Sequence, residues 1–68
     1  MKKTIIIKKK DIEDIAQEEK IYNHEDIILS WCRWWFKIKE NKVLRLDKRN
    51  IVYINDRYKD TYHVLIEY

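Results

Sequence analysis

The sequence contains neither glycine nor proline, and it has one cysteine among 68 residues. Glycine lets the backbone approach a phosphate closely, and it permits the sharp turn that presents an activated nucleophile. Phosphate-binding loops, dinucleotide fingerprints and nucleophile elbows of this glycine-dependent kind are therefore excluded. The lone Cys32 has no partner for a disulfide within the chain, so the fold depends on packing, and a reducing compartment is expected.

Long apolar runs are also missing. No stretch reaches the roughly 18 residues that a membrane-spanning helix requires, and the apolar centre of the first ten residues is too short for a signal peptide. We therefore expect a soluble, cytoplasmic protein with no membrane partner. Ile, Lys, Asn and Tyr are heavily used and Ala occurs once. This composition is typical of short AT-rich reading frames, which are common in phages and mobile elements.

The chain does contain enough apolar surface to fold. Apolar residues make up 46% of it, including three Trp, five Tyr and one Phe, although 40% of the residues are charged. A chain of this length forms a single domain, here residues 1–68, and buries only about 60% of the surface of its unfolded form. The large aromatic side chains are therefore expected to supply much of the core.

Charge is arranged in blocks that the net charge of +3 conceals. Residues 1–10 carry five lysines and no acid, whereas residues 11–26 carry seven acids against one lysine. Residues 27–49 then carry seven bases against two acids. We expect a strongly dipolar surface.

The apolar pattern predicts an α+β domain. The β-branched run TIIIKK near the N-terminus favours a strand, and residues 11–20 favour a short helix with Asp11 as N-cap. Alternation with a period of two predicts an antiparallel meander with strands at 43–47, 50–55 and 61–67. The N-terminal strand is expected to join this sheet, with the helices on one face. Without glycine, positive-φ turn positions should fall on Asn or Asp, the candidates being Asn41, Asn50, Asn55, Asp56 and Asp60.

The strongest helical pattern covers residues 24–38, with Asn23 as N-cap. At about 100° per residue, one side of this helix collects Ile27, Ile28, Trp31, Trp34, Trp35 and Ile38. We expect this tryptophan face to be buried, so that Trp34→Ala unfolds the domain. Alternating apolar residues from Cys32 to Ile38 also indicate a strand over 31–39. The helix is favoured because its period extends over more residues and has a start signal.

Residues that support catalysis or metal binding are too sparse to form a site. Ser30 falls on the polar side of the predicted helix, and Cys32 borders its apolar side, where a small buried side chain is expected. His24 and His63 lie far apart and lack the spacing of metal ligands. We expect no enzymatic activity, no bound metal and no cofactor.

Two functions remain. The favoured one is a small protein-interaction module, an inhibitor or adaptor of a larger protein, in which the acidic helix engages a basic groove and exposed apolar side chains add contact area. Its candidate contacts are Glu13, Glu18, Glu19, Leu29 and Phe36. A homodimer is compatible with this function, through Leu29, Phe36 or Leu65.

The alternative is a small nucleic-acid-binding protein that uses the basic 27–49 region and the N-terminal lysines. Its candidate contacts are Lys8, Lys9, Lys10, Arg33, Lys37, Arg45, Lys48 and Arg49. Protein binding is favoured because the seven carboxylates of residues 11–26 repel a polyanion that they face.

Overall fold

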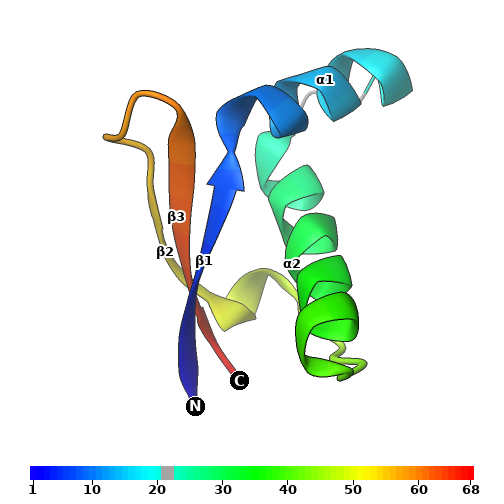
Figure 1. Cartoon of the computed structure of the whole chain (residues 1–68), viewed down its shortest axis with the longest axis vertical. Helices are drawn as coiled ribbons and strands as arrows, with labels where there is room; N and C mark the ends of the chain where they lie inside the picture. Colours follow the sequence, from blue (N-terminus) through cyan, green and yellow to red (C-terminus); the bar gives the residue numbers. More distant parts are fainter. Residues whose placement is uncertain (21–22) are drawn as a thin grey trace.

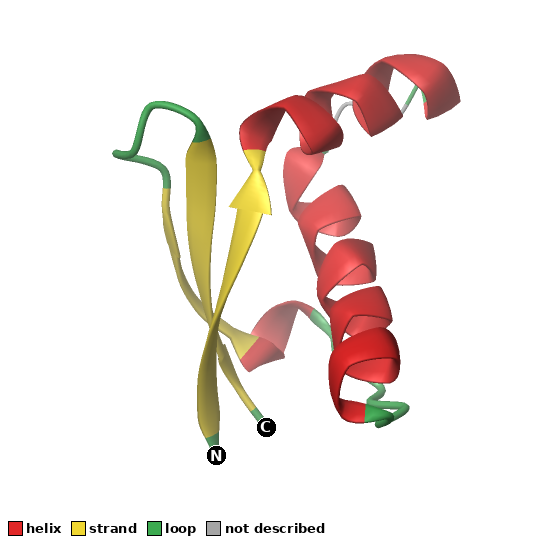
Figure 2. Ribbon diagram, in the orientation of Figure 1, coloured by secondary structure: helices red, strands yellow, loops and turns green. Residues whose placement is uncertain are grey.

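The computed structural model describes residues 1–20 and 23–68, and these residues form the expected α+β domain. In chain order the elements are β1 (Lys2–Lys8), α1 (Lys9–Glu19), α2 (His24–Glu40), the 3-10 turn η1 (Lys48–Asn50), β2 (Ile51–Asn55) and β3 (Thr61–Glu67). The sheet forms one layer, α2 lies along one of its faces, and α1 runs across one end of α2 (Figure 1). Figure 2 shows β1 leading directly into α1.

The sheet is antiparallel and has the order β1-β3-β2, so the C-terminal strand occupies its centre. The N-terminal strand thus joins the sheet, as expected. The two ends of the chain meet beside each other: the Met1 ammonium donates to the Tyr68 carbonyl at 2.6 Å, and the Tyr68 amide donates to the Met1 carbonyl at 2.8 Å. These bonds continue the pairing of β1 and β3 by one residue beyond the end of each strand, which limits fraying there.

The core lies between the sheet and α2. Alternate residues of β1 and β3 point into it, with Ile5 directly opposite Val64 in the register. Side chains from every layer complete the core, which consists of Ile5, Ile7, Ile12, Ala16, Ile27, Ile28, Leu29, Cys32, Phe36, Leu46, Val64 and Ile66.

The helix over residues 24–38 is confirmed, extended to Glu40, but it is rotated relative to the prediction. Leu29, Cys32 and Phe36 are buried in the core, whereas Trp34 and Ile38 are 52% and 56% exposed. Because apolar residues surround much of this helix, periodicity alone did not define its inward face. Close packing favours the side with the smaller side chains, Leu29, Cys32 and Phe36. A core of this size accommodates one ring and several aliphatic side chains more readily than three indoles.

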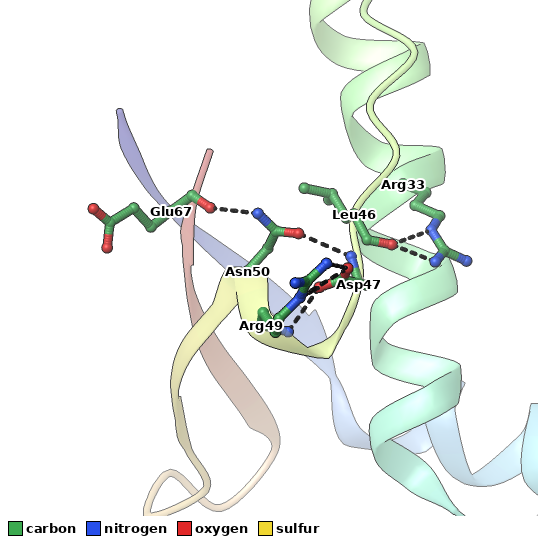
Figure 3. Close-up of polar contacts among 6 residues, drawn as sticks. All are labelled: Arg33, Leu46, Asp47, Arg49, Asn50 and Glu67. Carbon is green, nitrogen blue, oxygen red and sulfur yellow. Dashed lines mark hydrogen bonds and ion pairs between the residues drawn. The ribbon is translucent and has the colours of Figure 1, made fainter.

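The predicted strand at 43–47 is wrong, because residues 41–47 adopt no regular structure. Leu46 is buried, but the backbone around it bonds to other elements. Arg33 donates from Nε to the Leu46 carbonyl at 2.8 Å and also from Nη2 (Figure 3). A period of two indicates which side chains point inward and not where the backbone hydrogen bonds go.

The segment after Leu46 is held by a compact set of polar contacts (Figure 3). Asp47 caps η1 by accepting from the Arg49 amide at 2.9 Å, and the hydrogen bonds from Arg49 lower the pKa of the Asp47 carboxyl. Asn50 accepts from the Asp47 amide and donates to the Glu67 carbonyl, each at 2.9 Å. These contacts attach the start of β2 to the end of β3.

The helix ends correct two further details. Helix α1 begins at Lys9 and not at Asp11, because the Lys9 amide bonds to the Asp60 carbonyl in the β2–β3 connection at 2.9 Å. Asn23 does cap α2, accepting from the Glu25 amide at 3.1 Å. Within the described ranges, positive φ occurs at Asn41, one of the five candidates, and at Lys20, which was not a candidate. The expectation is wrong for the other candidates, Asn50, Asn55, Asp56 and Asp60.

Candidate functional site

A groove lies between α1 and α2. Its volume is about 380 Å³, and it is lined by Ile15 and Glu19 of α1 and by Asp26, Ile27, Ser30, Trp31 and Trp34 of α2. This volume falls within the range of about 300 to 1,000 Å³ that is usual for ligand sites. The groove therefore combines an apolar lining with two carboxylates and one hydroxyl.

The rotation of α2 places the tryptophans in this groove. Residues 27, 31 and 34 lie one and two turns apart and so share a side of the helix, while the core takes the neighbouring side. The rings of Trp31 and Trp34 are tilted by 53°, with their centroids 5.6 Å apart. Trp34 is half exposed, so part of its indole is available to a binding partner.

The third tryptophan has a different role. The Trp35 ring meets the edge of Phe36 at a centroid distance of 5.2 Å, and the Lys3 ammonium lies 5.2 Å from the centroid of Trp35. This side chain covers the Phe36 end of the core. The segment WCRWWFKIK thus supplies both core packing and a solvent-accessible aromatic surface.

Acidic groups dominate the charge near the groove. Glu19 lies in the last turn of α1, at the negative end of its helix dipole, and no basic residue occupies that turn. Asp26 lies in the first turn of α2, where the dipole favours a carboxylate, and it forms an ion pair with Lys48 at 3.3 Å. Both partners of this pair are about half exposed, so it contributes little to stability.

The residues proposed for partner binding separate into two groups. Glu13, Glu18 and Glu19 are exposed on α1, as expected, but only Glu19 lines the groove. Leu29 and Phe36 are 6% and 0% exposed, so the expectation that they form an exposed apolar edge is wrong. They belong to the core because α2 turns that side toward the sheet.

Sequence reasoning missed the groove itself. Helical periodicity assigns Trp31 and Trp34 to the core, and it does not bring Ile15 together with Asp26 and Ile27. Spacing along α2 does place 27, 31 and 34 together, but only the crossing of α1 brings Ile15 and Glu19 to the same site.

The proposed nucleic-acid contacts do not all lie together. Lys8, Lys9 and Lys10 lie where β1 passes into α1, whereas Lys48 and Arg49 lie in η1, near the opposite end of the sheet (Figure 1). Several of these cations contact the chain itself: Lys9 donates to the carbonyls of Asp56 and Tyr58, Arg33 to that of Leu46, and Arg49 to Asp47. Lys37 and Arg45 are exposed.

The residues considered for catalysis are dispersed. Burial raises the pKa of the Cys32 thiol to about 12, so this group stays protonated and unreactive at neutral pH. His63 stacks on Tyr58 at a centroid distance of 3.9 Å, and its Nε2 lies 3.1 Å from Thr61 Oγ1. Across residues 1–20 and 23–68, no cluster of three or more His, Cys, Asp or Glu side chains has the arrangement of a metal site.

The outer face of the sheet is a second exposed surface. Tyr53 and Thr4 flank Leu65 in the register, and Ile6 lies opposite His63. Ile6 and Tyr53 are more than half exposed. The groove between α1 and α2, and a smaller hollow lined by Glu13, Ala16, Gln17 and His24, are both formed by helix residues and not by this face.

Comparisons with known protein families, curated proteins and solved structures yield no match. In the part of the chain that the structure describes, neither helix has the length and apolar character needed to cross a membrane.

Proposed function

We propose that this chain is a small non-enzymatic interaction module that binds a larger protein through the groove between α1 and α2. One observation carries the proposal: two tryptophans, two isoleucines and two carboxylates converge on a groove of about 380 Å³. Tryptophan is among the residues that contribute most to protein interfaces when a partner covers it. The half-exposed Trp34 offers such a contact.

Charge supports a basic partner. The acids of residues 11–26 outnumber the lysine there by seven to one, and they lie on and beside α1. Such a field steers a positively charged surface toward the groove and repels a polyanion. An inhibitor or adaptor of the kind that phages and mobile elements encode acts in this way, by occupying a surface of its target. Reducing conditions suit the unpaired Cys32, and we place the protein in the cytoplasm.

Nucleic-acid binding is the less favoured function. Lys8, Lys9 and Lys10 lie apart from Lys48 and Arg49, and several of the candidate cations already contact backbone carbonyls or Asp47 of this chain. Exposed Lys37 and Arg45 remain its best candidates. Salt titration separates the two functions, because displacement of counterions from phosphates makes nucleic-acid affinity fall steeply with salt.

Two aromatic substitutions test the proposal. Trp34 and Tyr53 are 52% and 53% exposed, but Trp34 lines the groove and Tyr53 lies on the outer sheet face. The tagged chain and its Trp34→Ala and Tyr53→Ala variants are used to capture partners from the native source, with and without nuclease. We expect a protein that survives nuclease, is lost with Trp34→Ala and is retained with Tyr53→Ala. The opposite dependence on the two variants, or a nuclease-sensitive partner alone, contradicts the proposal.

Charge reversal gives an independent test. Replacing both Glu18 and Glu19 with Lys should weaken capture of the protein partner, because it reverses the local field. Thermal stability should be unchanged or slightly raised, since lysine suits the negative end of the α1 dipole. If this double variant instead binds nucleic acid more tightly, and the wild type also binds it substantially, the alternative function is supported.

A further inference from the structure

We infer that the groove between α1 and α2 recognises a basic side chain of the partner, with arginine preferred to lysine. This inference rests on the proposed function and specifies its chemistry. The half-exposed Trp34 indole provides aromatic surface, Ile15 and Ile27 provide apolar lining, and Glu19 and Asp26 provide carboxylates in the same groove. A cation with an apolar stem matches all three kinds of surface.

The aromatic rings of this chain already attract cations elsewhere. Lys3 lies 5.2 Å from the Trp35 centroid, Lys9 lies 5.4 Å from that of Tyr62, and Lys42 lies 5.9 Å from that of Tyr68. Among the described residues, no lysine or arginine is placed in this way over Trp31 or Trp34. Of the three tryptophans, Trp35 therefore already holds a cation of this chain, whereas Trp31 and Trp34 can accept one from another molecule.

The carboxylates of the groove are also poorly neutralised by the chain itself. Glu19 lies at the negative end of the α1 dipole, without a basic residue in the same turn. Asp26 forms one ion pair, a single contact of 3.3 Å with the exposed Lys48. An incoming cation therefore gains attraction from both carboxylates and competes only with a weak ion pair.

Arginine fits this combination better than lysine. Its planar guanidinium stacks on an indole while donating in pairs to carboxylates, and it is less strongly hydrated than an ammonium group. An acidic or neutral side chain gains the apolar contact alone. The expected order of affinity is arginine, then lysine, then citrulline, which has nearly the shape of arginine but no charge.

The experiment uses three capped pentapeptides that are identical except for Arg, Lys or citrulline at the central position. Each is titrated into the isotopically labelled full chain while the indole N–H signals of Trp31, Trp34 and Trp35 are followed by NMR. We expect the arginine peptide to shift Trp31 and Trp34 but not Trp35. The citrulline peptide should bind about tenfold more weakly, and salt should reduce this difference.

Matched variants locate the charge effect. Glu19→Gln should weaken binding of the arginine peptide several-fold, whereas Glu18→Gln, an adjacent exposed residue outside the groove, should change it little. Lys48→Gln should strengthen binding, because it frees Asp26 from its ion pair. Circular dichroism of each variant checks that it is folded.

Three results overturn the inference: equal binding of the citrulline and arginine peptides, an equal effect of Glu18→Gln and Glu19→Gln, or no arginine-dependent shift of Trp31 and Trp34. The proposed function fails separately, when partner capture no longer depends on Trp34. Loss of the arginine preference with Trp34-dependent capture intact therefore rejects the basic side chain and keeps the protein interface.

Discussion

The orientation of α2 is tested most directly by comparing two aromatic truncations on the same helix, Phe36→Ala and Trp34→Ala. Phe36 is fully buried, and its ring lies 5.2 Å from Trp35 and 4.9 Å from Tyr68, centroid to centroid. Trp34 is half exposed, and its nearest aromatic neighbour is Trp31 at 5.6 Å. Sequence periodicity alone favoured the reverse, with Trp34 in the core.

The structure separates the expected costs of the two changes. Truncating a buried Phe to Ala lowers the free energy of unfolding by about 3 to 5 kcal/mol, because apolar contact is lost and a cavity remains. For Trp34→Ala we expect about 2 kcal/mol, because the contacts of the buried half of the indole and one aromatic pair are lost. Phe and Trp have similar helix propensities, so the gain from introducing Ala is nearly the same in both variants.

Urea denaturation followed by far-UV circular dichroism measures both values. A domain of this size has a total stability of about 5 kcal/mol, so Phe36→Ala should be nearly or fully unfolded at room temperature. Trp34→Ala should remain folded, with its melting temperature lowered by about 8 to 16 °C. Phe36→Leu, which keeps much of the buried volume, provides a folded core variant whose loss should be smaller than that of Phe36→Ala.

A loss in Trp34→Ala equal to or greater than that in Phe36→Ala would refute this reasoning. It would mean that the tryptophan face of α2 packs against the sheet. The groove between α1 and α2 would then lack its aromatic wall, and both functional proposals would fail with it.

Three further predictions concern stability. Burial raises the pKa of Cys32 from 9.0 to about 12, so the thiol ionises first in the unfolded chain. The free energy of unfolding should therefore fall as pH rises from 9 toward 12, and less so in Cys32→Ala, as urea titrations at several pH values will show. Lys20→Gly should raise the melting temperature, because Lys20 has φ of 54° and glycine adopts this conformation without steric cost; a lowered melting temperature contradicts this. Arg33→Gln should cost about 1 to 2 kcal/mol in urea denaturation, because it removes charged donors from the Leu46 carbonyl; an unchanged midpoint would show that this contact is dispensable.

Much of the fold could be read from local patterns. The β-branched run at the N-terminus and the alternating C-terminal segment favour strands. After Asn23 the cap and the longer helical period favour a helix over the strand that residues 31–39 also fit. The α+β class and the helix in preference to a strand over 31–39 followed from such patterns. Of the five Asn and Asp candidates for positive φ, one, Asn41, adopts it. Glycine-dependent sites were excluded on composition alone.

Tertiary structure decided which side of α2 is buried, the path of residues 41–47, and the groove. Each depends on contacts between residues distant in sequence: the crossing of α1 over α2, and the bond from Arg33 to the Leu46 carbonyl. A helix with apolar residues around most of its circumference has several inward faces of similar hydrophobicity, and packing volume selects one of them. The exposure of Trp34 and its position near Glu19 therefore depend on how α1, α2 and the sheet pack together.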